Sequence, residues 1–133
     1  MFGFPEMTLG AFPGAGGAVI LPRLVGPANA RRYFYMARRA TSYELEDLGL
    51  IEQVVTRDEL LPAALALANS IAENTSPLGF AAVKRVINEG AGLPFEQAAA
   101  LDQSLRKPLE ATEDYAEGMK AQAEKRKARF SGR

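Results

Sequence analysis

Signals that start and stop helices follow one another along most of this chain, and they constrain its fold more than any other feature. Ser76-Pro77 and Thr112 are typical helix starts, because a Ser or Thr cap accepts a hydrogen bond from a free N–H and a first-turn proline needs no N–H partner. Gly90 is a typical stop. In the second half of the chain, the segments predicted to be helical are Thr56–Asn74, Pro77–Gly90, Pro94–Pro108 and Thr112–Lys127. Leu61, Leu65, Ala68 and Ile71 recur at the spacing of a helix face that packs into a core.

The first part of the chain is predicted to contain shorter elements. We expect a helix over about Ala15–Leu24, a second helix that begins at Pro27, and a third that Thr41 or Ser42 caps and that runs to Leu48 before Gly49. Ile51–Val55 is the only convincing strand, and Phe2–Leu9 is a candidate extended segment. The fold class predicted is therefore mainly α with one or two short strands. A chain of this kind lacks a sheet for its first strand, so we expect it to be the C-terminal part of something larger.

Composition excludes several kinds of protein. Lys plus Arg equals Asp plus Glu at 16 each, and a net charge of zero argues against a nucleic-acid or membrane-surface protein. The chain has no Cys and no His, which removes disulfide frameworks, thiolate nucleophiles, Ser-His-Asp triads and the usual zinc sites. Neither a transmembrane helix nor a signal peptide is recognisable. We expect a cytoplasmic protein without a metal site.

Glu6 is the candidate catalytic residue. It is the only side chain charged at neutral pH between Phe2 and Gly17, and its neighbours Met7 and Leu9 offer it no partner. The charged form of a carboxylate in such surroundings is disfavoured, which suits proton transfer near neutral pH. The alternative is a solvated loop glutamate beside a turn, which is the commoner situation for an isolated acid.

A loop of small residues follows Glu6. Pro13-Gly14 interrupts regular secondary structure. Gly16-Gly17 leaves the backbone without side chains, which suits a position that another group approaches closely. A phosphate-binding loop is disfavoured, because Val19 occupies the place of the last glycine in G-x-G-x-x-G and no Gly-Lys-Ser/Thr follows.

Arg31-Arg32 and Arg38-Arg39 recur seven residues apart, which on one helix would form a basic strip. We interpret that strip as a solvated helix face.

Several motifs together resemble the enoyl-CoA hydratase/isomerase family, the crotonase superfamily. They are Phe4-Pro5-Glu6, Pro13-Gly-Ala-Gly-Gly17, Leu21-Pro-Arg-Leu-Val-Gly26, Asn74-Thr-Ser-Pro77 and Glu124-Lys-Arg-Lys127 before Phe130. The resemblance covers the whole chain but only the second half of a typical member. It implies that residues 1–56 are the end of the crotonase ββα spiral, which forms an active-site wall, and that residues 57–133 are its helical trimerisation region.

The resemblance also implies roles for individual residues. Glu6 matches the family's catalytic acid/base, which exchanges a proton with the acyl chain beside a CoA thioester. Pro13 and Gly14 match a loop that lines the substrate pocket, and Lys125 matches a lysine that reaches the CoA phosphates or adenine. The CoA thioester is the substrate, and no separate cofactor is implied.

Hydratases of the family use a second Glu and a Gly-Gly-Gly upstream of the Glu6 position, and neither precedes Glu6 in this chain. The residues present therefore favour isomerase chemistry slightly, and we expect weak or no activity from the chain alone. Ala18-Val19-Ile20 replaces the common Thr-Gln-Arg, so acyl preference does not transfer. Gly14 stands where dienoyl-CoA isomerases carry an acid.

The expected partners are an acyl-CoA substrate and either further copies in a trimer-type assembly or a separate N-terminal half. The alternative is a non-catalytic helical oligomerisation module or a truncated remnant.

Overall fold

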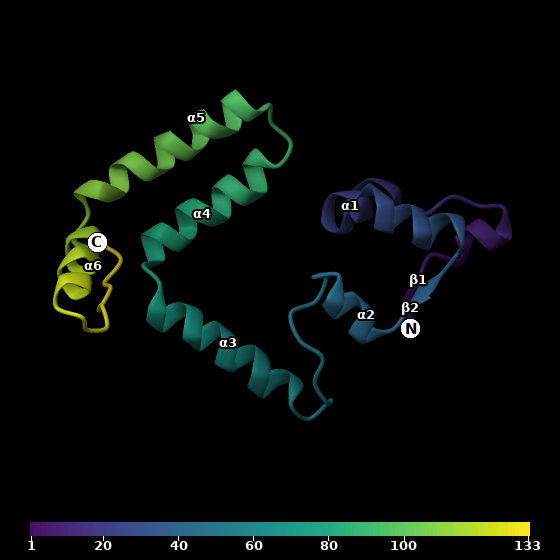
Figure 1. The fold of residues 1–133 in the computed structure, drawn as a ribbon, viewed down its shortest axis with the longest axis horizontal. Helices are drawn as coiled ribbons and strands as arrows, with labels where there is room; N and C mark the ends of the chain where they lie inside the picture. Colours follow the sequence, from purple (N-terminus) through teal and green to yellow (C-terminus); the bar gives the residue numbers. More distant parts are fainter. The chain divides into compact units, whose positions relative to one another are not determined.

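The computed structural model describes residues 1–133, which form two compact units, Met1–Glu59 and Leu60–Arg133 (Figure 1). The assignment of residues 1–56 to the end of a spiral and of residues 57–133 to a trimerisation region stays a prediction.

The first unit is built around one long helix. Its elements are β1 (Phe2–Gly3), the 3-10 helix η1 (Pro5–Leu9), α1 (Gly17–Tyr35), β2 (Arg39–Ala40) and α2 (Ser42–Asp47). β1 pairs antiparallel with β2, and Phe2 lies opposite Ala40. The predicted extended segment over Phe2–Leu9 is therefore a strand only at its start.

Helix α1 contains a break where the sequence predicts a boundary between two helices. Gly26 has φ 76° and ψ 156°, outside the helical region, and Pro27 follows it. The first part begins at Gly17 rather than Ala15, because Ala15 and Gly16 have left-handed φ values of 51° and 80°. The helix ends at Tyr35, so Arg38 and Arg39 do not extend a basic strip along it, and that prediction is wrong.

The core of the first unit comes from both parts of α1 and from β2 and α2. Its buried side chains are Leu21, Val25, Ala30, Tyr33, Phe34, Ala40 and Leu45. Phe4, which directly precedes η1, packs against this core, with its ring centroid 4.9 Å from that of Phe34. The turn that carries Glu6 is thus attached to the best-packed part of the unit.

Thr41 caps helix α2, as one of the two predicted alternatives, and it does so through a capping box. The Thr41 hydroxyl accepts from the Glu44 backbone N–H, and the Glu44 carboxylate accepts from the Thr41 backbone N–H. The predicted strand over Ile51–Val55 is wrong, because this segment has no strand neighbour. The backbone N–H of Val54 donates instead to the side chain of Glu46 on α2, at 3.0 Å.

All regular elements of the second unit are helices. It contains α3 (Leu60–Asn74), α4 (Pro77–Gly90), α5 (Phe95–Arg106), the 3-10 helix η2 (Lys107–Ala111) and α6 (Glu113–Ala123). Helices α4 and α5 form a hairpin, and η2 connects α5 to α6 (Figure 1). Ser76 and Thr112 cap α4 and α6 through their side chains, which confirms both predicted starts.

Two features of the second unit differ from expectation. Helix α6 ends at Ala123 and not at Lys127, because the chain turns back at Lys125, whose φ is 51°. On α3, Leu61, Leu65 and Ile71 remain 66%, 53% and 37% exposed, so the face predicted to pack into a core is uncovered in this chain. None of the helices is both long and apolar enough to cross a membrane.

Candidate active site

A short turn between β1 and α1 positions Glu6. Pro5 occupies the first position of η1, where its missing N–H costs nothing, and the Thr8 hydroxyl donates to the Pro5 carbonyl at 2.8 Å. Gly10 ends η1 in the left-handed conformation, and the Ala11 N–H donates to the Glu6 carbonyl at 2.9 Å. The backbone of Glu6 is therefore fixed by local hydrogen bonds that leave its side chain uncommitted.

The Glu6 carboxylate has one buried oxygen. Oε2 is shielded from solvent and has no hydrogen-bond partner in this chain. Buried polar atoms are nearly always paired, because an unpaired one loses its hydration without compensation. This arrangement does not fit the alternative of a fully solvated loop glutamate. It leaves an acceptor available to a proton donor that enters the site.

Pro13 and Gly14 follow in the loop that leads to α1. Pro13 is buried and, with Met7 and Phe12, lines an apolar pocket of about 310 Å³ against the middle of α1. Gly14 is exposed, and its carbonyl accepts from the Gly17 N–H at 3.0 Å. The structure thus places Glu6, Pro13 and Gly14 in one unit, on consecutive turns before α1.

The contact that holds this turn against α1 was only partly foreseen from the sequence. The glycine pair indicated that some group approaches the backbone, and the structure identifies that group as the ring of Phe4. A β-carbon on Gly17 would lie 2.8 Å from Cε1 of Phe4. The sequence did not indicate that Phe4 and Phe34 pack together, because residues so far apart in the chain are not related by the repeat of a helix or a strand.

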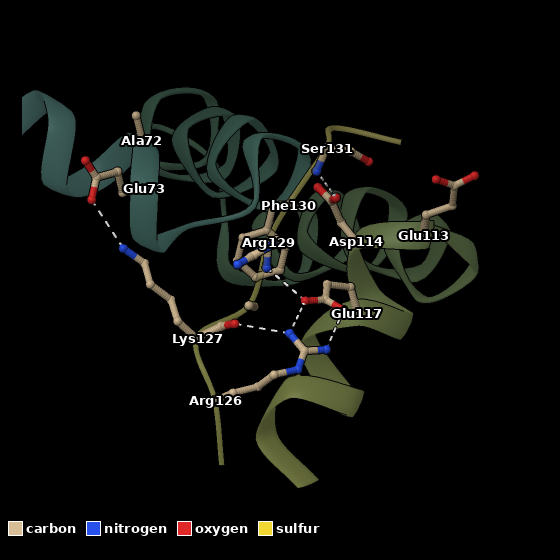
Figure 2. A pocket seen from close by; sticks show the side chains of 11 residues that line it. Ala72, Glu73, Glu113, Asp114, Glu117, Arg126, Lys127, Arg129, Phe130 and Ser131 are labelled. Carbon is tan, nitrogen blue, oxygen red and sulfur yellow. Dashed lines mark hydrogen bonds and ion pairs between the residues drawn. The ribbon is translucent and has the colours of Figure 1, made fainter. Parts of the chain in front are cut away.

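Lys125, the fourth predicted site residue, belongs to the second unit. It lies just beyond α6, is exposed, and donates its backbone N–H to the Gln122 carbonyl at 3.2 Å. Beside it lies an open groove of about 1020 Å³ between α6, the end of α3 and the C-terminal segment (Figure 2). Lys125 is not among the residues that line this groove.

The groove carries both signs of charge, and most of its cations are already paired. Arg126 binds both oxygens of Glu117, at 2.6 and 2.9 Å, and Lys127 binds Glu73 at 3.2 Å (Figure 2). The hydrogen bonds from Arg126 and from the Arg129 backbone lower the pKa of Glu117 to about 2. The Glu117 carboxylate in turn raises the pKa of Arg126. These pairs fasten the C-terminal segment to α6 and α3.

Asp114, at the start of α6, makes a second set of hydrogen bonds to the C-terminal segment. Its carboxylate accepts from the Ser131 backbone at 2.7 Å, the Ser76 hydroxyl at 2.8 Å and the Gly132 backbone at 3.1 Å. Burial raises the pKa of Asp114, but these hydrogen bonds outweigh burial and the net change is downward. The structure contains no group of carboxylates able to hold a metal ion.

The family model for enoyl-CoA hydratase/isomerase matches residues 1–133. The chain belongs to the enoyl-CoA hydratase/isomerase family. It is 39% identical over 129 residues to a crotonyl-CoA hydratase of Syntrophomonas wolfei, covering 97% of this chain and 49% of the relative. It is 36% identical over 132 residues to a 2,3-dehydroadipyl-CoA hydratase of Escherichia coli, covering 99% of this chain and 51% of the relative.

Solved structures of family members have the same fold. The crystal structure of an enoyl-CoA hydratase subunit I from Geobacillus kaustophilus matches with a TM-score of 0.84 and 36% identity, over 99% of this chain and 51% of that one. The chain therefore has the crotonase-type fold of this family over its length. It spans about half the length of the relatives it matches.

Proposed function

We propose that this chain forms the side of an acyl-CoA site that carries Glu6. Glu6 would be the acid/base of that site in water addition or double-bond migration. The observation that carries the proposal is the buried Oε2 of Glu6, which lacks a hydrogen-bond partner on a turn otherwise fixed by hydrogen bonds. Membership of the enoyl-CoA hydratase/isomerase family supports the chemistry. Pro13 and Gly14 would line the acyl end of the site, and Lys125 would meet the CoA phosphates or adenine.

The chemistry needs a group that can hold and release a proton. In hydration, the oxygen of water adds to the β-carbon while the carboxylate takes one of the water's protons, and the resulting carboxylic acid passes a proton to the α-carbon. In isomerisation, one carboxylate can remove a proton from C2 and return it at C4. A single positioned carboxylate typically contributes about 10²–10⁴ to such a proton transfer.

The residues present favour isomerisation over hydration and predict a slow reaction. The chain contains no Gly-Gly-Gly, the feature that supplies oxyanion donors in the family by resemblance. Loss of one such donor typically costs about 10²–10³ in turnover. We therefore propose weak or absent turnover by the 133-residue chain alone.

The test compares crotonyl-CoA hydration and 3-enoyl-CoA isomerisation by the chain, by Glu6→Gln and by Glu52→Gln. Glu52 is an exposed carboxylate of the same unit and serves as the matched control. Assays are run on the chain alone and with the N-terminal half of the Escherichia coli relative added. A rate that Glu6→Gln lowers and Glu52→Gln leaves unchanged supports the proposal. Equal rates for all three proteins, where turnover is measurable, remove Glu6 from the mechanism.

A non-catalytic helical oligomerisation module is the second candidate. The uncovered face of α3 supports it, since Leu61 and Leu65 are 66% and 53% exposed and such surfaces usually mark contact with another chain. Light scattering after size exclusion tests it. A trimer that lacks turnover with the added half favours this function, whereas a monodisperse monomer that binds no such half contradicts it.

A further inference from the structure

The ring of Phe4 occupies the space where Gly17 would carry a side chain. Around an ideal β-carbon at Gly17, the nearest atoms are Cε1, Cδ1 and Cζ of Phe4, at 2.8, 3.5 and 3.6 Å. The first distance is shorter than real β-carbons tolerate, so even an alanine at this position would displace the ring. Gly17 lies at the first position of α1 and has no left-handed φ, so its backbone does not itself require glycine.

Phe34 restricts how the Phe4 ring can move. It lies 4.9 Å from the Phe34 ring, centroid to centroid, with the planes tilted by 54°. Phe34 is buried in the core of the first unit. Phe4 also borders a pocket of about 460 Å³, but Phe34 closes the side toward the core. A side chain at residue 17 would therefore shift the Phe4 ring together with the backbone that carries it.

That backbone leads directly to Glu6. Phe4 is the residue before Pro5, whose ring fixes its own φ, and Pro5 begins the 3-10 turn on which Glu6 is the second residue. A displacement of Phe4 is therefore transmitted through a stiff residue to the Glu6 turn. We propose that Gly17 and Phe4 are positioning residues, which together fix the turn that keeps Oε2 of Glu6 buried for proton transfer. The catalytic part of this statement rests on the function proposed for Glu6.

Carboxyl labelling with a carbodiimide and an added amine tests the positioning step directly. The segment Met1–Arg23 contains one acidic side chain, Glu6, so the label on its tryptic peptide reports on that carboxylate alone. We expect Glu6 to be labelled more slowly than the exposed Glu52 in the unaltered chain, because one of its two oxygens is buried and the residue is half-buried. Gly17→Ala should speed the labelling of this peptide severalfold.

A compensating substitution distinguishes positioning from general loss of structure. Phe4→Leu removes the ring atoms that an alanine at position 17 would meet, so the double variant Gly17→Ala/Phe4→Leu should label more slowly than Gly17→Ala. Gly92→Ala is the matched control, since a β-carbon there meets nothing within 4 Å. A double variant that labels as fast as Gly17→Ala, or a Gly17→Ala chain that labels like the unaltered one, overturns the proposal.

Two further readouts keep the result interpretable. If circular dichroism shows that Gly17→Ala does not fold, Phe4→Leu alone decides: it should speed Glu6 labelling by loosening the turn, and an unchanged rate overturns the proposal. Where turnover is measurable, Gly17→Ala should lower kcat and leave KM unchanged. If Glu6 does not have the proposed catalytic role, the unaltered chain and Glu6→Gln will show equal turnover. The labelling results would not change in that case, so the two failures can be told apart.

Discussion

Arg126 and Glu117 form an ion pair with two hydrogen bonds, Nη1 to Oε1 at 2.6 Å and Nη2 to Oε2 at 2.9 Å. The pair joins α6 to the segment after it, and the same carboxylate accepts from the Arg129 backbone N–H at 2.9 Å. Arg126 also binds Glu124 at 2.6 Å. The reversal of the chain after α6 is therefore held by one guanidinium between two carboxylates, of which Figure 2 shows the pair with Glu117.

This pair predicts loss of stability in acid. The folded-state pKa of Glu117, about 2, lies below its usual value of 4.5, so its contribution to stability is fully present above about pH 4.5 and is lost as the pH falls toward 2. Glu117→Gln should lower the thermal midpoint near neutral pH, and the difference from the unaltered chain should shrink on acidification.

Thermal unfolding followed by circular dichroism across this range measures the effect of Glu117→Gln. Glu96→Gln is the control, because Glu96 is exposed and the structure shows no hydrogen bond to its carboxylate. A Glu117→Gln difference that stays constant with pH would contradict the prediction.

Asp114 should control how firmly the C-terminal segment is attached. Asp114→Ala removes the acceptor for Ser131, Gly132 and Ser76, whereas an asparagine at this position retains one acceptor oxygen. We expect trypsin to cleave severalfold faster after the Lys and Arg residues at 125, 126, 127 and 129 in Asp114→Ala, with Asp114→Asn between it and the unaltered chain. Asp102→Asn, at a 54% exposed carboxylate on α5, should leave the rate unchanged, and cleavage at equal rates in all variants would refute the role.

Much of the helical architecture could be predicted because its signals are local. Thr41, Ser76 and Thr112 cap the helices that follow them, and each cap needs only residues within one turn. The strand predicted over Ile51–Val55 failed because a strand also requires a partner, which apolar composition does not reveal. The last helix was predicted too long, because the charges of Arg126 and Lys127 suit a helix end as well as they suit ion pairs beyond it.

The candidate site was predictable only in part. The isolation of Glu6 among apolar residues could be recognised from sequence, but the burial of its Oε2 depends on how the chain packs in three dimensions. The contact of Phe4 with Gly17 and Phe34 joins residues without a common period. Its discovery needed the three-dimensional structure.

The capping box of α2 predicts a measurable stability loss. Thr41→Ala removes the acceptor for the Glu44 backbone N–H, which lies 3.2 Å from the hydroxyl. Loss of such a cap costs about 1 kcal/mol. Urea unfolding should show this decrease for Thr41→Ala and little change for Ser42→Ala, the neighbouring hydroxyl, for which the structure shows no hydrogen bond. Equal effects of the two substitutions would rule out the cap as the cause.

The break in α1 should depend on glycine at position 26. Its φ of 76° with ψ of 156° lies in a region that essentially only glycine adopts, and strain of this kind costs about 1–3 kcal/mol for other residues. The space around its side-chain position is open, so Gly26→Ala reports backbone strain without a clash. We expect a lower free energy of unfolding for Gly26→Ala than for Gly92→Ala, measured in urea. An unchanged value for Gly26→Ala would mean that the kink is not a strained feature of the fold.

Two leucines one turn apart on α1 allow the core of the first unit to be tested with the same substitution. Leu21 is 9% exposed and belongs to the core cluster, whereas Leu24 is 62% exposed. A buried Leu→Ala substitution costs about 2–5 kcal/mol, because it removes apolar contacts and leaves a cavity. An exposed one usually changes stability by about 0.5 kcal/mol or less.

Leu21→Ala should therefore lower the free energy of unfolding far more than Leu24→Ala. It should also speed carbodiimide labelling of Glu6, since Phe4 packs against the same core. Comparable losses for both leucines would show that the first unit does not have the core described.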